Sequence, residues 1–96
     1  MFEWDDDKKQ SNLAEHGLSF EDAEAVFSGP YVTNEDTRRE YGEQRFITLG
    51  QLDGRTVVIA HTPRGENTRI ISMRKANSRE QKNYQERLEA SRRDEG

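Results

Sequence analysis

The sequence predicts an α+β fold with two N-terminal helices, an antiparallel sheet of three to four strands and a C-terminal helix. Apolar residues recur with helical spacing up to about residue 28, and from residue 31 they follow the period of two that is typical of strands. Asp53-Gly54 separates two alternating segments and is a strong signal for a type I′ hairpin turn. A meandering sheet covered on one face by helices would bury these apolar positions economically.

The first 30 residues predict two helices with clear boundaries. Asp5 is a good N-cap for the first helix, and Gly17 suits a left-handed C-cap at its end. Ser19 can cap the second helix, which Gly29-Pro30 ends. The second helix has a buried face formed by Phe20, Ala23, Val26 and Phe27. Residues 2–4 precede both helices and form either a short strand or an anchored arm.

The remaining elements follow from alternation and turn residues. The expected strands are residues 31–33, 45–52, 55–62 and 68–74, with residues 63–67 as a loop. The first of these strands is the one that a three-stranded sheet would lack. Ser78 and Gln81 form a capping box for the final helix. We therefore expect a single domain over residues 1–88 and a polar, frayed tail over residues 89–96.

Composition excludes several classes of protein. Of the 96 residues, 35% are charged and only 30% are hydrophobic, so the core must be small and a large buried catalytic cavity is not expected. The longest apolar run is four residues, which predicts neither a membrane span nor a signal peptide. The chain has no cysteine and two histidines, so we expect no metal or cofactor. These features are typical of a small soluble protein of the cytoplasm.

Charge is distributed unevenly along the chain, although the total is only −4. Residues 1–37 carry ten carboxylates and two lysines, a net charge of −8, whereas residues 38–75 carry seven arginines, one lysine and four carboxylates, a net charge of +4. Arginine holds phosphate through a planar fork of donors. The middle segment therefore predicts a local phosphate-binding site on an acidic body, although arginines on exposed strands can also serve solubility alone.

The hairpin turn at Asp53-Gly54 sets the expected strand register. It places Phe46 opposite His61 and residue 45 opposite residue 62. If residue 62 also pairs with residue 68 across the loop, Arg69 lies across from His61. This register gathers Arg45, His61, Arg64 and Arg69 at one end of the sheet, with Glu43 just before it, and places Arg74 toward the other end. Such a cluster needs neutralisation by carboxylates or by an anionic ligand.

Each of these residues also has a structural interpretation. His61 on a strand can be a half-buried structural residue, and Glu43 can serve only as an arginine partner. The polar stripe of Lys8, Asn12 and His16 on the first helix can be a solvated face. Trp4 is best interpreted as a packing anchor.

One ordered set of residues extends over about nine-tenths of the chain. The set is Phe2-x-Trp4-Asp5, Lys8, Asn12, His16-Gly17-x-Ser19-Phe20, Ala23, Val26-Phe27, Gly42-Glu43-x-Arg45, Gly50, Thr62-x-Arg64, Arg69-Ile70-Ile71-Ser72-x-Arg74-x-Ala76, Glu80 and Tyr84. In its order and spacing this set resembles the BrnT-type toxins.

The resemblance implies a RelE-like ribonuclease fold and a bacterial type II toxin that cleaves RNA and inhibits translation. It implies functional positions at Glu43, Arg64 and Arg74, with Arg45 and Arg69 as supporting RNA-binding residues. It also implies a BrnA-type antitoxin partner, with operator DNA bound only through that antitoxin as the complex represses its own operon. The net charge of −4 departs from the basic character expected of such toxins.

The chemistry expected of such a site is cleavage without a metal, in which a 2′-hydroxyl attacks the adjacent phosphate. Glu43 is the candidate base and His61 the candidate acid, while the arginines stabilise charge on the phosphate. Two alternatives remain open. The arginine end can bind RNA or an acidic antitoxin segment without cleaving it, or the chain can be a structural domain with charged edges.

Overall fold

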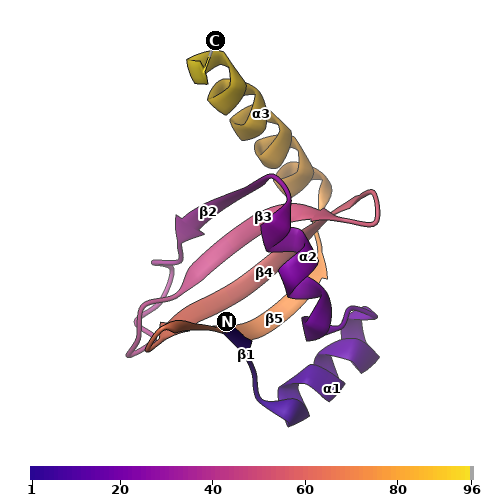
Figure 1. Cartoon of the computed structure of the whole chain (residues 1–96), viewed down its shortest axis with the longest axis vertical. Helices are drawn as coiled ribbons and strands as arrows, with labels where there is room; N and C mark the ends of the chain where they lie inside the picture. Colours follow the sequence, from indigo (N-terminus) through magenta and orange to yellow (C-terminus); the bar gives the residue numbers. More distant parts are fainter. Residues whose placement is uncertain (96) are drawn as a thin grey trace.

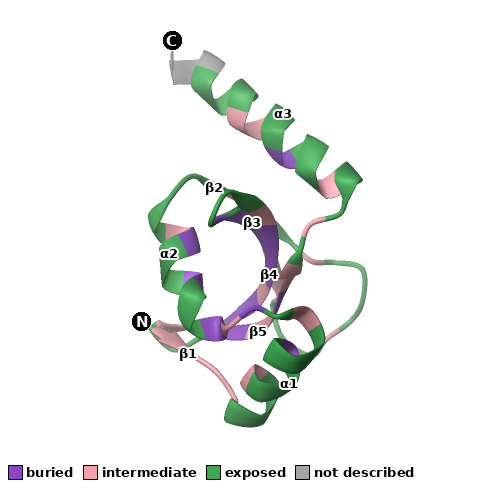
Figure 2. Ribbon diagram, turned by 90° about the vertical axis from the view of Figure 1, so that its right-hand side faces the viewer, coloured by how far each residue is buried: buried purple, intermediate pink, exposed green. Residues whose placement is uncertain are grey.

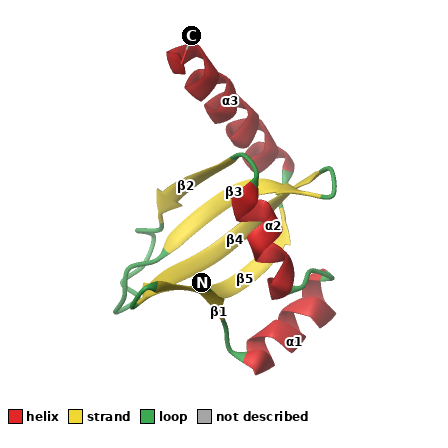
Figure 3. Ribbon diagram, viewed as in Figure 1, coloured by secondary structure: helices red, strands yellow, loops and turns green. Residues whose placement is uncertain are grey.

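A five-stranded sheet in the order β1-β5-β4-β3-β2 forms the centre of the computed structural model, which confirms the α+β class (Figure 1, Figure 3). The structure describes residues 1–95, with side chains through residue 92. In chain order the elements are β1 (Phe2–Glu3), α1 (Asp6–His16), the 3₁₀ turn η1 (Phe20–Asp22), α2 (Ala23–Ser28), β2 (Tyr31–Glu35), β3 (Phe46–Leu52), β4 (Arg55–Arg64), β5 (Asn67–Lys75) and α3 (Ser78–Glu95).

The first strand corrects the prediction of a purely antiparallel sheet. β1 pairs in parallel with the start of β5, where Phe2 lies opposite Thr68 and Glu3 opposite Arg69. The sheet is therefore mixed and has one strand more than expected. Phe2 holds β1 in place because its ring stacks on Phe27 of α2, with 5.3 Å between the ring centroids.

The helix boundaries follow from local hydrogen bonds. The Asp5 carboxylate accepts from the backbone N–H groups of Asp7 and Lys8, and Gly17 ends α1 with a φ of 72°, both as predicted. The α3 cap differs from the prediction by one residue. Asn77 and Glu80 bond each other's backbone N–H groups at 2.8 and 2.9 Å, so they form the capping box in place of Ser78 and Gln81.

The two long hairpins differ in how well their turns were predicted. Leu52 lies opposite Arg55 and Phe46 opposite His61, which confirms the turn at Asp53-Gly54. The expected five-residue loop is wrong, because β4 and β5 continue to a two-residue turn in which Arg64 lies opposite Asn67. Gly65, first in that turn, has a φ of 61°, which glycine adopts without steric cost.

This tighter turn changes the register between β4 and β5. Arg69 lies opposite Thr62, and Ile70 lies opposite His61, where Arg69 was expected. A bulge follows, because the neighbour of His61 pairs with Ser72 and leaves Ile71 as the extra residue.

Helices cover both faces of the sheet, which corrects the expectation of helices on one face only. Apolar residues of η1 and α2 pack on one face with Ile59, Ile70 and Met73 (Figure 2). On the other face, Tyr84 of α3 packs with Leu49 and Val58. Trp4 packs against the first of these cores as an anchor, in an edge contact with Phe20 at 6.3 Å.

The C-terminal helix continues through residues 89–95, where the sequence predicts a frayed tail. Residue 96, the end of that predicted tail, lies outside the described residues. Among residues 1–95, no helix combines the length and the apolar character that crossing a membrane requires.

Candidate functional site

Strand alternation places four arginines on the face of the sheet that α3 partly covers. His61, Ile70 and Met73 point toward α2 and its core, so the residues beside them in sequence point the other way. We call this surface the arginine face, and its members are Arg45, Arg64, Arg69 and Arg74. Arg74 lies five positions along β5 from Arg69 and opposite Val58, at the end of this face next to α3. This agrees with the predicted register, which places Arg74 toward the other end of the sheet from the remaining arginines.

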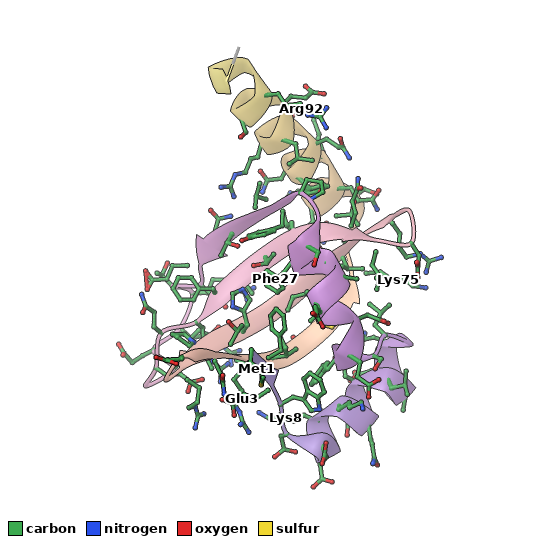
Figure 4. The ribbon with its side chains drawn as sticks, in the orientation of Figure 1. Met1, Glu3, Lys8, Phe27, Lys75 and Arg92 are labelled. Atoms are coloured by element: carbon green, nitrogen blue, oxygen red, sulfur yellow. The ribbon has the colours of Figure 1, made fainter. Side chains whose placement is uncertain are left out.

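Three of these arginines form ion pairs with carboxylates from three different parts of the fold. Arg45 contacts Glu43 at 3.1 Å, and Arg69 contacts Glu3 of β1, labelled in Figure 4, at 3.1 Å. Arg74 binds Glu80 of α3 through both terminal nitrogens, at 2.8 and 2.7 Å. Arg64 is exposed, and among residues 1–92, whose side chains the structure describes, it takes part in no ion pair. Arg64 is therefore the member of the face whose full charge is open to an anion.

The Arg74–Glu80 pair connects the sheet to α3. The paired guanidinium lowers the pKa of the Glu80 carboxyl from its ordinary value and is helped by the backbone N–H of Asn77. In turn the carboxylate raises the pKa of Arg74. The positive charge of Arg38, on the loop between β2 and β3, also acts to lower the pKa of both groups.

That loop, residues 36–45, contributes groups that the sequence did not single out. The Asp36 carboxylate binds the Arg38 guanidinium through both oxygens, at 2.8 and 3.0 Å, and accepts a hydrogen bond from the Tyr41 hydroxyl at 2.9 Å. The guanidinium carbon of Arg45 lies 4.2 Å from the centre of the Tyr41 ring. The sequence shows only that charged and aromatic residues are frequent between these two strands. That composition does not indicate which of them contact one another.

His61 lies on the opposite face from the arginines. Its ring is buried and contacts Phe27 (labelled in Figure 4) and Phe46 at centroid distances of 5.3 and 5.9 Å. Its Nε2 lies 2.7 Å from the hydroxyl of Thr48, which in turn lies 2.7 Å from that of Thr33. Burial lowers the pKa of His61, which favours the neutral ring. The predicted juxtaposition of His61 with Arg69 is therefore wrong, because the register differs by one residue and successive residues face opposite sides.

The polar stripe of α1 is only partly solvated. Asn12 is buried, and its amide binds the backbone of Met73 and the carbonyl of Leu18. Lys8 and His16 flank it and line a cavity of about 360 Å³ beside the bulge at residues 71–72 of β5. Asn12 therefore docks α1 against the edge of the sheet, while Lys8 and His16 stand on either side of that contact.

The geometry defines a class of protein: a small α+β protein whose sheet presents arginines, one of them unpaired, to an anionic ligand. Within the described residues, no three side chains of the metal-binding types gather as a metal site. Residues 4–80 match the family model described as the ribonuclease toxin BrnT of type II toxin-antitoxin systems. The chain belongs to this family and is a ribonuclease toxin of a type II toxin-antitoxin system, whose partner is an antitoxin. No curated protein sequence matches the chain.

Proposed function

We propose that the arginine face binds RNA and that the chain cleaves it as a metal-independent endoribonuclease. The observation that carries this proposal is the state of Arg64, which is exposed and has no ion-pair partner among the side chains of residues 1–92, while the other three arginines of the face are held by carboxylates. A phosphate fits the planar donors of a free guanidinium. Arg45 and Arg69 support the same strand of RNA, and Arg74 stands farther along the face.

In the proposed reaction a 2′-oxygen forms a bond to the adjacent phosphorus, and the bond from phosphorus to the 5′-oxygen breaks. The products are a 2′,3′-cyclic phosphate and a free 5′-hydroxyl. Glu43 accepts the proton of the 2′-hydroxyl, because Arg45 binds only its Oε2 and leaves Oε1 available. Arg64 stabilises the charge on the phosphate that is attacked. Arg74 lies opposite Val58, six positions along β4 from Arg64, so it binds a different phosphate of the same strand. With His61 buried on the other face, water supplies the proton to the 5′-oxygen.

Such cleavage in the cytoplasm would inhibit translation, and a BrnA-type antitoxin would neutralise the chain. The open charge of Arg64 gives an acidic antitoxin segment a partner that relieves repulsion among the arginines. Operator DNA would be bound through the antitoxin, since residues 1–37 of this chain carry a net charge of −8.

The experiment compares RNA cleavage by purified wild type, Arg64→Ala and Arg55→Ala. Arg55 is the matched control because it is exposed at the other end of the same strand. We expect Arg64→Ala to cut about 10²–10³-fold more slowly and Arg55→Ala to cut at the wild-type rate. Cleavage should persist in EDTA and stop when the attacking 2′-hydroxyl is replaced by hydrogen. Wild-type cleavage by Arg64→Ala would refute the site, and loss of cleavage in EDTA would refute metal independence.

A second function, RNA or antitoxin binding without cleavage, is favoured by the carboxylates that already occupy three of the four arginines. It predicts that Glu43→Gln binds RNA as wild type does and that neither protein cuts it. Induced expression in bacteria separates the two functions, because only cleavage should halt growth and degrade RNA in the wild type while sparing Arg64→Ala.

A further inference from the structure

We propose that Tyr41 and Arg45 form a stacking site for an unpaired nucleobase of the RNA. The inference rests on the proposed function only in naming RNA as the ligand. Tyr41 and Arg45 lie on the loop of residues 36–45, with the Arg45 guanidinium carbon 4.2 Å from the Tyr41 ring centre. Unpaired bases stack on aromatic rings and on guanidinium planes, and both surfaces are combined here.

The platform is held in place before any ligand arrives. The Tyr41 hydroxyl donates to Asp36, whose side chain is only 5% exposed and is also bound by both sides of the Arg38 fork. The Arg38 guanidinium holds the pKa of Asp36 far below its usual range, so the carboxylate stays charged. The Nε of Arg45 donates to Glu43, which limits rotation of the guanidinium plane. Ligand binding therefore needs little ordering of the platform.

Two hydrogen bonds attach the loop to the arginine face. The N–H of Asp36 donates to the carbonyl of Arg45 at 2.8 Å, which closes the base of the loop. The Thr62 hydroxyl donates to the carbonyl of Gln44 at 2.6 Å, and Thr62 lies opposite Arg69 in the sheet. The stacking site thus borders the phosphate-binding arginines. A base can reach it while the phosphate of the same or the next nucleotide contacts Arg69 or Arg64.

The ligand class follows from the groups present. The Tyr41 hydroxyl donates to Asp36 and the Nε of Arg45 donates to Glu43, so the platform offers a ligand its π faces and the terminal N–H groups of Arg45. Every nucleobase has a π face, so stacking at this site tolerates different bases. An abasic position keeps the phosphate and the sugar but has no base to stack. It therefore separates the contribution of stacking at Tyr41 and Arg45 from that of phosphate binding by the other arginines.

The test uses single-stranded 2′-O-methyl RNA, which the proposed reaction cannot cleave, and the same strand with one abasic position moved along it. Binding is measured as Kd by fluorescence anisotropy. For wild type we expect one abasic position to weaken binding about 5- to 100-fold. Tyr41→Ala should bind the intact and abasic strands equally, at the wild-type abasic affinity. Tyr41→Phe keeps the ring and should retain most of the difference. Asp36→Asn should reduce the difference, because it weakens the support of the ring.

Tyr31→Ala is the matched control, because Tyr31 is an exposed tyrosine on β2 that packs against Phe27 of α2. This variant should show the same difference in Kd between the intact and the abasic strand as wild type does. Should Tyr41→Ala fail to fold, Tyr41→Leu keeps an apolar side chain and tests the same loss of stacking. Equal binding of intact and abasic strands by wild type, or full discrimination by a folded Tyr41→Ala or Tyr41→Leu, would overturn the stacking site. A wild type that binds the intact strand more tightly than the abasic strand but leaves unmodified RNA uncut would overturn the proposed cleavage and retain the stacking site.

Discussion

The side chain of Asn12 binds Met73 as a neighbouring strand would. Its Oδ1 accepts from the N–H of Met73 at 3.1 Å, and its Nδ2 donates to the carbonyl of Met73 at 2.9 Å. These two hydrogen bonds satisfy backbone groups at the edge of β5. The short strand β1 covers that edge only as far as Arg69. One amide thus fixes α1 to the sheet and blocks an edge that another chain could otherwise pair with.

Replacing Asn12 with leucine should destabilise the fold by about 3 kcal/mol, because two backbone groups of Met73 would lose their partners. The free energy of unfolding from urea denaturation measures this loss. Ser11→Ala, on the next exposed position of α1, serves as the control and should stay within about 0.5 kcal/mol of wild type. A similarly small loss for Asn12→Leu would show that water replaces the amide at this edge.

Glu80→Gln should make the free energy of unfolding less dependent on pH between pH 7 and 3. The Arg74 guanidinium lowers the pKa of Glu80, so the pair stabilises the fold above the ordinary carboxyl pKa, and this stabilisation is lost as pH falls through the lowered value. At pH 7 the substitution should cost up to about 1 kcal/mol, since the pair is partly exposed. Urea unfolding at pH 7, 5 and 3 checks this, with the exposed Glu86→Gln as control. Parallel profiles for wild type and Glu80→Gln would contradict it.

His61→Gln separates a structural histidine from a catalytic acid. Burial lowers the pKa of His61, so its neutral form stabilises the fold above the unfolded value of 6.5, and stability falls as pH drops below that value toward the lowered one. We expect the variant to lose this dependence between pH 7 and 5. Its cleavage rate at a temperature where it is folded should stay within about threefold of wild type, because a lost general acid would cost about 10²-fold or more. A loss of that size would return His61 to the mechanism.

Gly50→Ala should destabilise the fold by about 1–3 kcal/mol through overpacking. A Cβ at residue 50 would lie 2.5 Å from Cγ1 of Val26 and 3.5 Å from Cβ of Tyr31, so α2 would have to move away from β3. Gly29→Ala is the control, since its Cβ would meet only the Val26 carbonyl at an ordinary 3.9 Å. Thermal unfolding of both variants tests this, and equal Tm values would contradict the close approach.

The elements that the sequence predicted correctly depend on interactions within a few residues. Asp5 caps α1 through N–H groups two and three positions away, and Gly17 ends it through its own φ. Asp53 and Gly54 adopt positive φ values of 51° and 79° and so set the register of β3 and β4 by themselves. The α3 cap was misplaced by one residue, because Asn77 and Ser78 both begin acceptable boxes and Arg74 favours the one that contains Glu80.

The register of β4 and β5 could not be found in this way. Ile70 and Met73 are both buried in the same core although they lie three residues apart, so the strand needs an extra residue between them. Pro63 and the polar residues after it are typical of a loop. The burial of both apolar side chains in one core accounts for the bulge, and it depends on residues far away in the sequence. The parallel strand β1 likewise depends on the distant ring of Phe27.

By itself, the sequence determined both ends of α1, the hairpin turn at Asp53-Gly54 and the arginine-rich middle segment, because each is a local property of the chain. Tertiary structure alone decided which groups share a surface. A shift of one residue in β5 placed Arg69 beside Thr62 and away from His61, which faces the core on the other side of the sheet. The folding of residues 36–45 around Asp36 then brought Tyr41 beneath Arg45 at the border of the arginine face, and contacts between distant segments are specified only when the whole chain packs.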